Sequence, residues 1–300
     1  MKFMPRLLII GCGDVALRAA PLLREKFRLF GLTRSIENSA LVRNHGITPI
    51  LGDLDTLASL HRLGGIADSI LHSAPPPNHG RLDTRTRHLI GALSKGEMLP
   101  QRVVYISTSG VYGDCNGASI DETRPLNPQT PRAQRRVDAE QRLRVWCADN
   151  AISLSILRSP GIYAADRLPL ARLQRRLPVL NQSEDVFTNH IHADDLAQAC
   201  IAALFRGQPL RAYNICDGIN QTMGDYFDQI AEAFALEKPP RVTRVEAEQM
   251  IAEPGLSFMR ESRCLQNRRM VEELRVRMKY PSVDSLLCGL KPKAHGATRA

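Results

Sequence analysis

The chain has 300 residues, of which 43% are hydrophobic and 24% charged; these proportions are ordinary for a folded globular protein, and no apolar run approaches the ~20 residues that span a bilayer. Its net charge is +9, yet arginines alternate with acids and aromatics make up only 5%, so a nucleic-acid-binding protein is not expected. The excess positive charge suits an anionic cofactor or substrate. The seven cysteines include no Cys-x-x-Cys pair, and the first residues lead straight into a strand pattern without a signal-peptide cleavage site, so we expect a reduced, cytoplasmic protein.

Strand and helix patterns alternate through the first half of the chain. Strands are expected at Arg6–Ile10, Arg28–Thr33, Thr48–Leu51, Ser69–Ser73, Arg102–Ser107 and Ser153–Arg158. Helices are expected at Val15–Lys26, Thr84–Leu93 and Pro131–Asp149, and Pro21 predicts a kink or an early end in the first of them. This alternation predicts an α/β fold of the Rossmann type, a doubly wound parallel sheet with helices on both faces.

The alternation weakens beyond about residue 160. We therefore expect a dinucleotide-binding domain over residues 1–160 and a smaller C-terminal α/β lobe, mainly over 161–300, that binds the substrate. Residues 186–216 are expected to return to the first domain. Helices are predicted at Ala193–Phe205 and Met223–Ala235, with a strand at Ala212–Cys216 between them, and the tail from about residue 291 is expected to be frayed.

The first strand is followed by a glycine-rich turn that opens a helix. Its residues fit G-x-G-x-x-G/A: Gly11, Cys12, Gly13, Asp14, Val15 and Ala16. In this pattern the first glycine allows a tight turn, the second lets a pyrophosphate approach the backbone, and the small sixth residue permits close helix–strand packing. Free N–H groups and the helix dipole would hold the phosphates, while Asp14, which could cap the helix, brings a negative charge near them. We predict a dinucleotide site here.

The end of the second strand indicates which dinucleotide binds. An NAD site usually has an acid there to bond the ribose 2′-hydroxyl, whereas this chain has Arg34 and no acid nearby. A guanidinium pairs well with a 2′-phosphate, so NADP is expected in preference to NAD. Asp53 and Leu54 after the third strand are expected near the adenine, and Ser73, Ala74 and Pro75 after the fourth are expected to line the cleft.

From the fifth strand onward the chain resembles a known family. The segments that carry the resemblance are Val103–Gly113, Asp121-Glu122 with Pro125, Leu157–Tyr163, Ile191–Ala197, Tyr213–Ile215 and Met223–Tyr226. In this order they resemble the extended short-chain dehydrogenases/reductases, the epimerase/dehydratase family, over roughly residues 6–235. Within it the chain is most similar to a bacterial subgroup of compact, atypical members that are regarded as NAD(P)-dependent oxidoreductases or epimerases.

The resemblance implies a catalytic trio that is incomplete in this chain. Family members use a Ser or Thr, together with Tyr-x-x-x-Lys on a helix, to transfer a hydride and a proton. Thr108 matches the Ser/Thr position, and Glu140 fits a Glu four residues after the Lys, which puts Arg136 in the Lys position and Arg132 in the Tyr position. Arginine cannot act as the acid or base because its pKa is above about 12. The resemblance leaves Arg136 as a ligand of the nicotinamide ribose and places Thr108 and Pro160 at the cofactor.

Another group would therefore have to move the proton. Tyr112 and Tyr163 are the first candidates, with packed aromatic side chains as the alternative for both. A metal is not expected, because His190 and His192 lack a third ligand at fixed spacing and fit better as supports of the following helix. Cys12 fits a small buried residue better than a reactive thiol.

The sequence therefore favours an NADP(H)-dependent oxidoreductase or epimerase acting on a small polar or anionic carbonyl or hydroxyl compound. The alternative is an NADP-binding redox sensor or scaffold with little catalysis. The identity of the substrate is not determined by the sequence, and a homodimer is left open. Nucleotide sugars are disfavoured because the second lobe is short and poor in aromatics.

Overall fold

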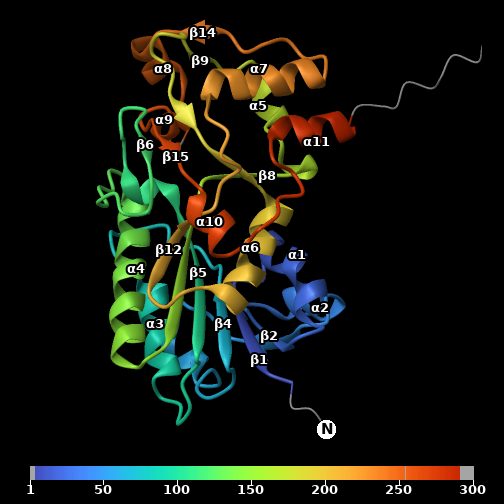
Figure 1. Cartoon of the computed structure of the whole chain (residues 1–300), viewed down its shortest axis with the longest axis vertical. Helices are drawn as coiled ribbons and strands as arrows, with labels where there is room; N and C mark the ends of the chain where they lie inside the picture. Colours follow the sequence, from blue (N-terminus) through green and yellow to red (C-terminus); the bar gives the residue numbers. More distant parts are fainter. Residues whose placement is uncertain (1–3, 254, 291–300) are drawn as a thin grey trace, which may run out of the picture.

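The computed structural model describes residues 4–253 and 255–290, which form a Rossmann-type α/β domain and a second lobe on top of it (Figure 1). The central sheet has seven parallel strands in the order β12-β7-β5-β4-β1-β2-β3. Their bounds are β1 Arg6–Ile10, β2 Arg28–Thr33, β3 Thr48–Leu51, β4 Ser69–His72, β5 Arg102–Thr108, β7 Ser153–Ser159 and β12 Arg211–Asn214. The predicted doubly wound fold is confirmed.

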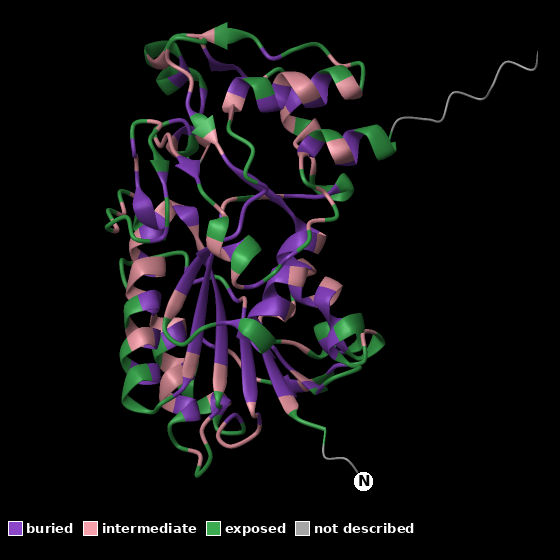
Figure 2. Ribbon diagram, viewed as in Figure 1, coloured by how far each residue is buried: buried purple, intermediate pink, exposed green. Residues whose placement is uncertain are grey.

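Helices cover both faces of this sheet, and the central strands are buried along nearly their whole length, whereas the edge strand β3 is half exposed (Figure 2). One face carries α1 (Asp14–Leu23), α2 (Ile36–Asn44) and α6 (Ala193–Arg206), whose apolar side chains share a core with β1 and β2. The other face carries α3 (Thr84–Leu93) and α4 (Pro131–Asp149). The helix α1 ends at Leu23, two residues after Pro21, in line with the predicted early end.

The second lobe consists of short elements from residue 161 onward, together with β6 (Ser119–Ile120). They are β8 Gly161–Tyr163, α5 Leu170–Gln174, β9 Val179–Leu180, β10 Phe187–Thr188, β11 His190–His192, β13 Gln221–Thr222, α7 Met223–Ala233, β14 Arg241–Val242, α8 Arg244–Met250, α9 Gly255–Phe258, β15 Cys264–Leu265 and α11 Val283–Leu290, whereas α10 Arg268–Glu272 packs against β12 of the large sheet. Four two-stranded sheets join them in the pairs β10-β13, β11-β8, β14-β9 and β15-β6.

Between these segments, α6 and β12 lie with the first domain, where α6 packs on α1 and β12 forms an edge of the large sheet. The domain boundary near residue 160 stays a prediction, and the tail expected to fray lies outside the described residues. Of the helices in the described part of the chain, none combines the length and apolar character that crossing a membrane requires.

Candidate functional site

A cleft of about 1030 Å³ lies between the carboxyl ends of the sheet strands and the second lobe. This is the edge at which open parallel sheets bind ligands. The residues predicted to hold the cofactor all line it: Gly11, Cys12, Gly13, Asp14, Val15, Ala16, Arg34, Asp53, Leu54, Ser73, Ala74, Pro75, Thr108, Arg136 and Pro160. Their roles toward a cofactor stay predictions, but the fold brings them together.

The two glycines of the turn face different surroundings. Gly11 has a φ of +93°, and a Cβ there would overlap the backbone nitrogen of Ala74 at the end of β4. Gly13 has an ordinary φ of −90°, and a Cβ there would meet no atom within 4 Å. Gly11 is thus required by the packing of the turn against its own fold, whereas Gly13 leaves open a space into which a pyrophosphate fits.

The helix α1 begins at this turn without a capping side chain. Its N-cap is Gly13, so the expected cap by Asp14 is not formed. The Asp14 carboxylate instead accepts hydrogen bonds from Arg18 at 2.8 Å and from Arg167 of the second lobe at 2.9 Å. The first-turn N–H groups therefore remain available to a phosphate, and two guanidinium groups offset the negative charge of Asp14.

Cys12 packs inside the turn. Its Sγ lies 3.8 Å from the carbonyl oxygen of Leu32, and burial raises the pKa of the thiol to about 12. The side chain is therefore an uncharged packing group at neutral pH, as predicted, although Cys12 is only half-buried and lines the cleft.

At the end of β2, Arg34 projects into the cleft from an exposed position. Within the described residues its guanidinium makes no hydrogen bond or ion pair. The next residue, Ser35, caps α2 by accepting a hydrogen bond from the Asn38 backbone at 3.3 Å. The neighbouring acid Asp55 is paired with Arg85 at 2.6 Å. Arg34 is therefore a cation with free donors beside a helix N-terminus.

At the opposite end of the cleft, α4 presents the two arginines that stand where the resemblance leads one to expect Tyr and Lys. Both Arg132 and Arg136 line the cleft, one helical turn apart. Arg136 donates from Nη1 to the hydroxyl of Tyr105 at 3.0 Å and to the carbonyl of Ile106 at 2.9 Å, which fixes it against β5. Thr108, at the end of β5, lines the same space.

The structure places Tyr112 and Tyr163 outside the cleft, which corrects the expectation that they could move the proton. Each is 1% exposed. The Tyr112 hydroxyl donates to Asn214 at 2.7 Å and accepts from Arg158 at 2.9 Å, and the Tyr163 hydroxyl donates to the Tyr280 carbonyl at 3.3 Å. Both side chains have inward hydrogen-bond partners, so they pack in the interior and stabilise the fold.

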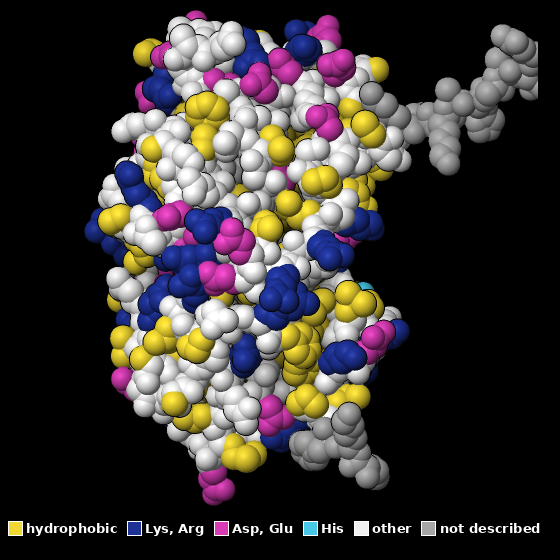
Figure 3. Space-filling view, in the orientation of Figure 1, with side chains coloured by type: hydrophobic (Ala, Val, Ile, Leu, Met, Phe, Trp, Pro, Cys, Tyr) yellow, Lys and Arg dark blue, Asp and Glu magenta, His cyan; other side chains and the backbone are white. Residues whose placement is uncertain are grey.

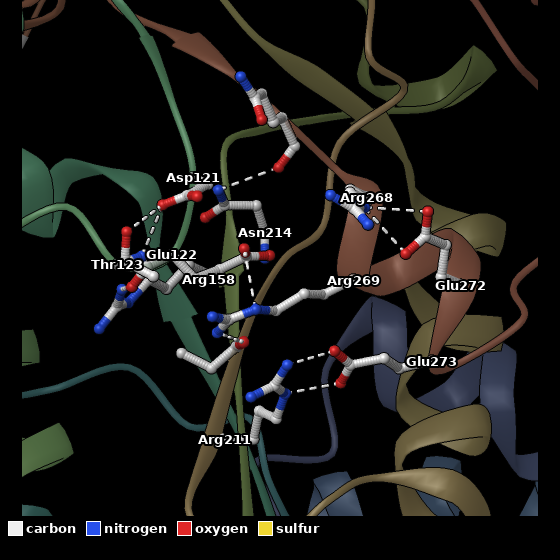
Figure 4. A network of polar contacts seen from close by, with 12 residues as sticks. Asp121, Glu122, Thr123, Arg158, Arg211, Asn214, Arg268, Arg269, Glu272 and Glu273 are labelled. Atoms are coloured by element: carbon white, nitrogen blue, oxygen red, sulfur yellow. Dashed lines mark hydrogen bonds and ion pairs between the residues drawn. The ribbon is translucent and has the colours of Figure 1, made fainter.

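A buried polar network supports the wall behind Thr108. The ion pair of Arg158 with Glu140 is 2.8 Å long, with side chains 4% and 1% exposed, and Ser107 donates to Glu140 at 2.6 Å. Asn214 continues the network, because its backbone N–H donates to Glu122, which also pairs with Arg269 of α10 (Figure 4). The network ties β5, β7, α4 and α10 together.

Several residues that line the cleft from the second lobe were not predicted. They are Phe187, His190, Tyr226, Phe258, Glu261 and Arg263. Tyr226 stacks on His190 with ring centroids 3.9 Å apart, and Glu261 pairs with Arg263 at 2.8 Å. The sequence carries one signal that could have pointed to Tyr226, since Met223–Tyr226 is among the segments that resemble the family. The resemblance alone, however, does not indicate that this side chain contacts the cleft.

The two histidines of β11 support the fold. His192 is the N-cap of α6 and accepts a hydrogen bond from the Asp194 backbone at 3.1 Å. His190 lies under Tyr226, and burial lowers its pKa to about 3. Among the residues that the structure describes, no group of three or more His, Cys, Asp or Glu side chains is placed to hold a metal ion.

Comparisons with known proteins agree with this arrangement. Residues 18–216 match the NAD dependent epimerase/dehydratase family. The chain belongs to this family. Human dTDP-D-glucose 4,6-dehydratase is 24% identical over 123 residues, and the matched stretch spans 38% of this chain and only 35% of the human protein.

Solved structures resemble the chain over nearly its whole length. A conserved protein of unknown function from Silicibacter pomeroyi is 28% identical, with a TM-score of 0.76, over 96% of this chain and all of its own. The dTDP-glucose 4,6-dehydratase of Streptomyces venezuelae, solved with NAD bound, has a TM-score of 0.75 at 21% identity over 94% of this chain and 95% of its own. The second likeness shows a shared fold.

Proposed function

We propose that the chain binds NADP(H) in the cleft and uses it to oxidise or reduce a small polar or anionic compound at a carbonyl or hydroxyl group, as an oxidoreductase or epimerase. The observation that carries the proposal is the continuity of the cleft, which runs from the uncapped glycine turn and Arg34 to Thr108 and α4. The bound dinucleotide would supply or accept the hydride.

The preference for NADP rests on the surroundings of Arg34. Its guanidinium is unpaired among the described residues and stands at the N-terminus of α2, where a 2′-phosphate would gain both a planar fork of donors and the helix dipole. An NAD site would need a carboxylate here to bond the 2′-hydroxyl, and β2 ends at Thr33 without one.

The proton has to pass through a group that reaches the cleft. Tyr226 does so, as the tyrosine among the described residues that line it, and Thr108 can orient the reacting oxygen. Burial raises the pKa of Tyr226, so its phenol keeps its proton at neutral pH. We propose Tyr226 as the proton donor in place of Tyr112 and Tyr163.

The test is a titration of the protein with NADPH and NADH, followed by an assay of NADPH oxidation against a library of carbonyl compounds. Tighter binding of NADPH together with turnover of any member supports the proposal. Equal affinity for the two cofactors would overturn the preference for NADP, and the absence of NADPH binding would overturn the whole proposal.

A second function is a redox sensor that binds NADP(H) and signals through a partner. The observation that favours it is that Tyr112 and Tyr163 are buried in the interior, while arginines stand on α4 where the resemblance leads one to expect the Tyr–Lys pair. Tight NADPH binding without turnover of any substrate would favour the sensor over the enzyme.

A further inference from the structure

The half of the cleft formed by α4 and the second lobe is strongly cationic. The charged side chains that line it are Arg132, Arg135, Arg136, Arg167, Arg172, Glu261 and Arg263, of which Arg167 is paired with Asp14. Among the described lining residues of this half, Glu261 is therefore the one carboxylate, and it is already paired with Arg263. The nucleotide half, by contrast, contributes two aspartates, Asp14 and Asp53, and two arginines, Arg34 and Arg85, so its charges are balanced.

The arginines of α4 differ in how they are held. Arg135 donates to the carbonyl of Gly80, and Arg136 is fixed by Tyr105 and Ile106. Arg132 makes no hydrogen bond or ion pair within the described residues. Its guanidinium lies 4.6 Å from the centre of the Phe258 ring, which orients it without using its donors.

Like charges are gathered around this free guanidinium. Burial and the nearby Arg136, Arg135 and Arg263 lower the pKa of Arg132, and Glu261 alone opposes them. Cations held together in a cleft repel one another, and an anion bound between them removes the repulsion. This half of the cleft therefore carries an excess of positive charge, which favours the binding of an anion.

We propose that Arg132 and Arg263 bind an oxyanion group, a carboxylate or a phosphate, which the substrate carries close to its reacting carbon. The guanidinium fork matches either group with two parallel hydrogen bonds. The reacting carbon is placed near Thr108, and Arg132 stands about one turn, roughly 6 Å along α4, from Arg136, which is fixed against β5. This placement of the carbon rests on the proposed function, whereas the anion site itself does not.

The site is tested by calorimetric titration with inorganic phosphate and with oxalate, in the presence and absence of saturating NADPH. We expect Arg132→Gln to weaken binding about ten- to a hundredfold, as loss of a charge-assisted pair does. Arg87→Gln, an exposed change on α3 outside the cleft, should leave the affinity unchanged. Glu261→Gln should strengthen binding, because it removes the competing carboxylate.

We therefore expect the anion affinity to fall in Arg132→Gln, to stay unchanged in Arg87→Gln and to rise in Glu261→Gln. Equal anion affinity in the parent and Arg132→Gln, or the absence of anion binding in the parent, would overturn the anion site. If NADPH fails to bind, the proposed function fails, while the titrations without NADPH still decide the anion site.

Turnover then distinguishes the two sources of the oxyanion. Pyruvate is compared with methyl pyruvate, and dihydroxyacetone phosphate with dihydroxyacetone, as substrates for NADPH oxidation. A higher kcat/KM for the charged member of either pair, lost in Arg132→Gln, supports the proposal and identifies the group. Equal or better turnover of both neutral members would overturn it and leave the proposed function standing.

Discussion

The two halves of the cleft are built in different ways. The nucleotide half is formed by the turns that follow β1, β2 and β4 and by the starts of α1 and α2, with Gly11 packed directly against the backbone of Ala74. The substrate half consists of α4 and of short segments of the second lobe between residues 167 and 263, which contribute charged and aromatic side chains. A site made of backbone depends on the fold as a whole, so it tolerates most sequence change. A site made of side chains can acquire a new specificity through single substitutions.

The largest expected effect is a loss of nucleotide binding that leaves the fold intact. Gly13→Val should abolish NADPH binding, because the branched side chain fills the open space above the turn. The free energy of unfolding should change by no more than about 1 kcal/mol, because φ at Gly13 is already negative. Fluorescence titration and urea unfolding measure the two quantities.

Gly11→Ala is the contrasting control, since its positive φ and its overlap with Ala74 should destabilise the protein by about 1–3 kcal/mol. Undiminished NADPH binding by Gly13→Val would show that the nucleotide lies elsewhere.

The next effect concerns proton transfer in the substrate half. If the protein is an enzyme, Tyr226→Phe should lower kcat by about a hundred- to ten-thousandfold with little change in NADPH affinity. Tyr163→Phe is the matched control: it removes a hydroxyl that faces the Tyr280 carbonyl in the interior, so kcat should stay near that of the parent. A larger loss in Tyr163→Phe than in Tyr226→Phe would reverse the assignment.

A smaller effect tests the choice of dinucleotide. Arg34→Asp should weaken NADPH binding about ten- to a hundredfold and narrow or reverse the preference over NADH, because a repulsive carboxylate would replace the partner of the 2′-phosphate. Arg43→Asp makes the same change in net charge on α2, away from the cleft, and should leave the preference intact. If both variants lose NADPH affinity equally, general electrostatics would explain the effect without a specific contact.

The smallest effect is a dependence of stability on pH. Burial lowers the pKa of His190 to about 3, below its value near 6.5 in the unfolded chain. The unfolded state thus binds more protons, and stability present above pH 6.5 is lost as the pH falls toward 3, by at most about 1.4 kcal/mol per pH unit. In His190→Phe, which keeps the stacking on Tyr226, this part of the loss should vanish.

The informative quantity is the difference between the parent and the variant, measured by urea unfolding at pH 6 and pH 4. Other groups titrate in the same range: buried His72 has a pKa lowered to about 3, and buried Asp217 has a pKa raised to about 7, which gives the opposite slope. An unchanged difference between the two pH values would show that His190 does not stay neutral in the folded protein.

The nucleotide half could be predicted from the sequence because local patterns determine it. The bounds of β1, β2, β3, α3 and α4 match the expectation, and the glycine turn lies at the strand end where a Rossmann unit requires it. The main local error concerned Asp14, which was expected to be able to cap the helix. A sequence cannot reveal that Arg167, far along the chain, pairs with its carboxylate.

The substrate half could not be predicted in this way. Phe258, Glu261 and Arg263 come from a four-residue helix and irregular chain, where no periodicity indicates which side chains face a cleft. The sequence also does not show in which direction the Tyr112 side chain points. Its hydroxyl lies in the interior, where it forms hydrogen bonds with Arg158 and Asn214. The second lobe was expected to be poor in aromatics, yet Phe187, Tyr226 and Phe258 all line the cleft.

Surface arginines and cleft arginines differ in whether a carboxylate pairs with them. Figure 3 shows Lys and Arg side chains interspersed with acids at mid-height on the face viewed. Near α10 and β12, Arg211 pairs with Glu273, and Arg268 pairs with Glu272 at 2.9 Å. These arginines are satisfied by carboxylates, whereas Arg34 and Arg132 in the cleft are not paired with any carboxylate of the described residues.

The pair of Arg167 with Asp14 joins the second lobe to the turn that begins α1, and Arg18 adds contacts to Asp166 at 3.2 Å and to Asp194 at 2.8 Å. Any motion that separates the lobes at this point has to break the Arg167–Asp14 contact. Such half-exposed pairs weaken as salt screens them. The energy needed to break this contact, and with it the resistance of the lobes to separation at this point, should therefore fall as the ionic strength of the medium rises.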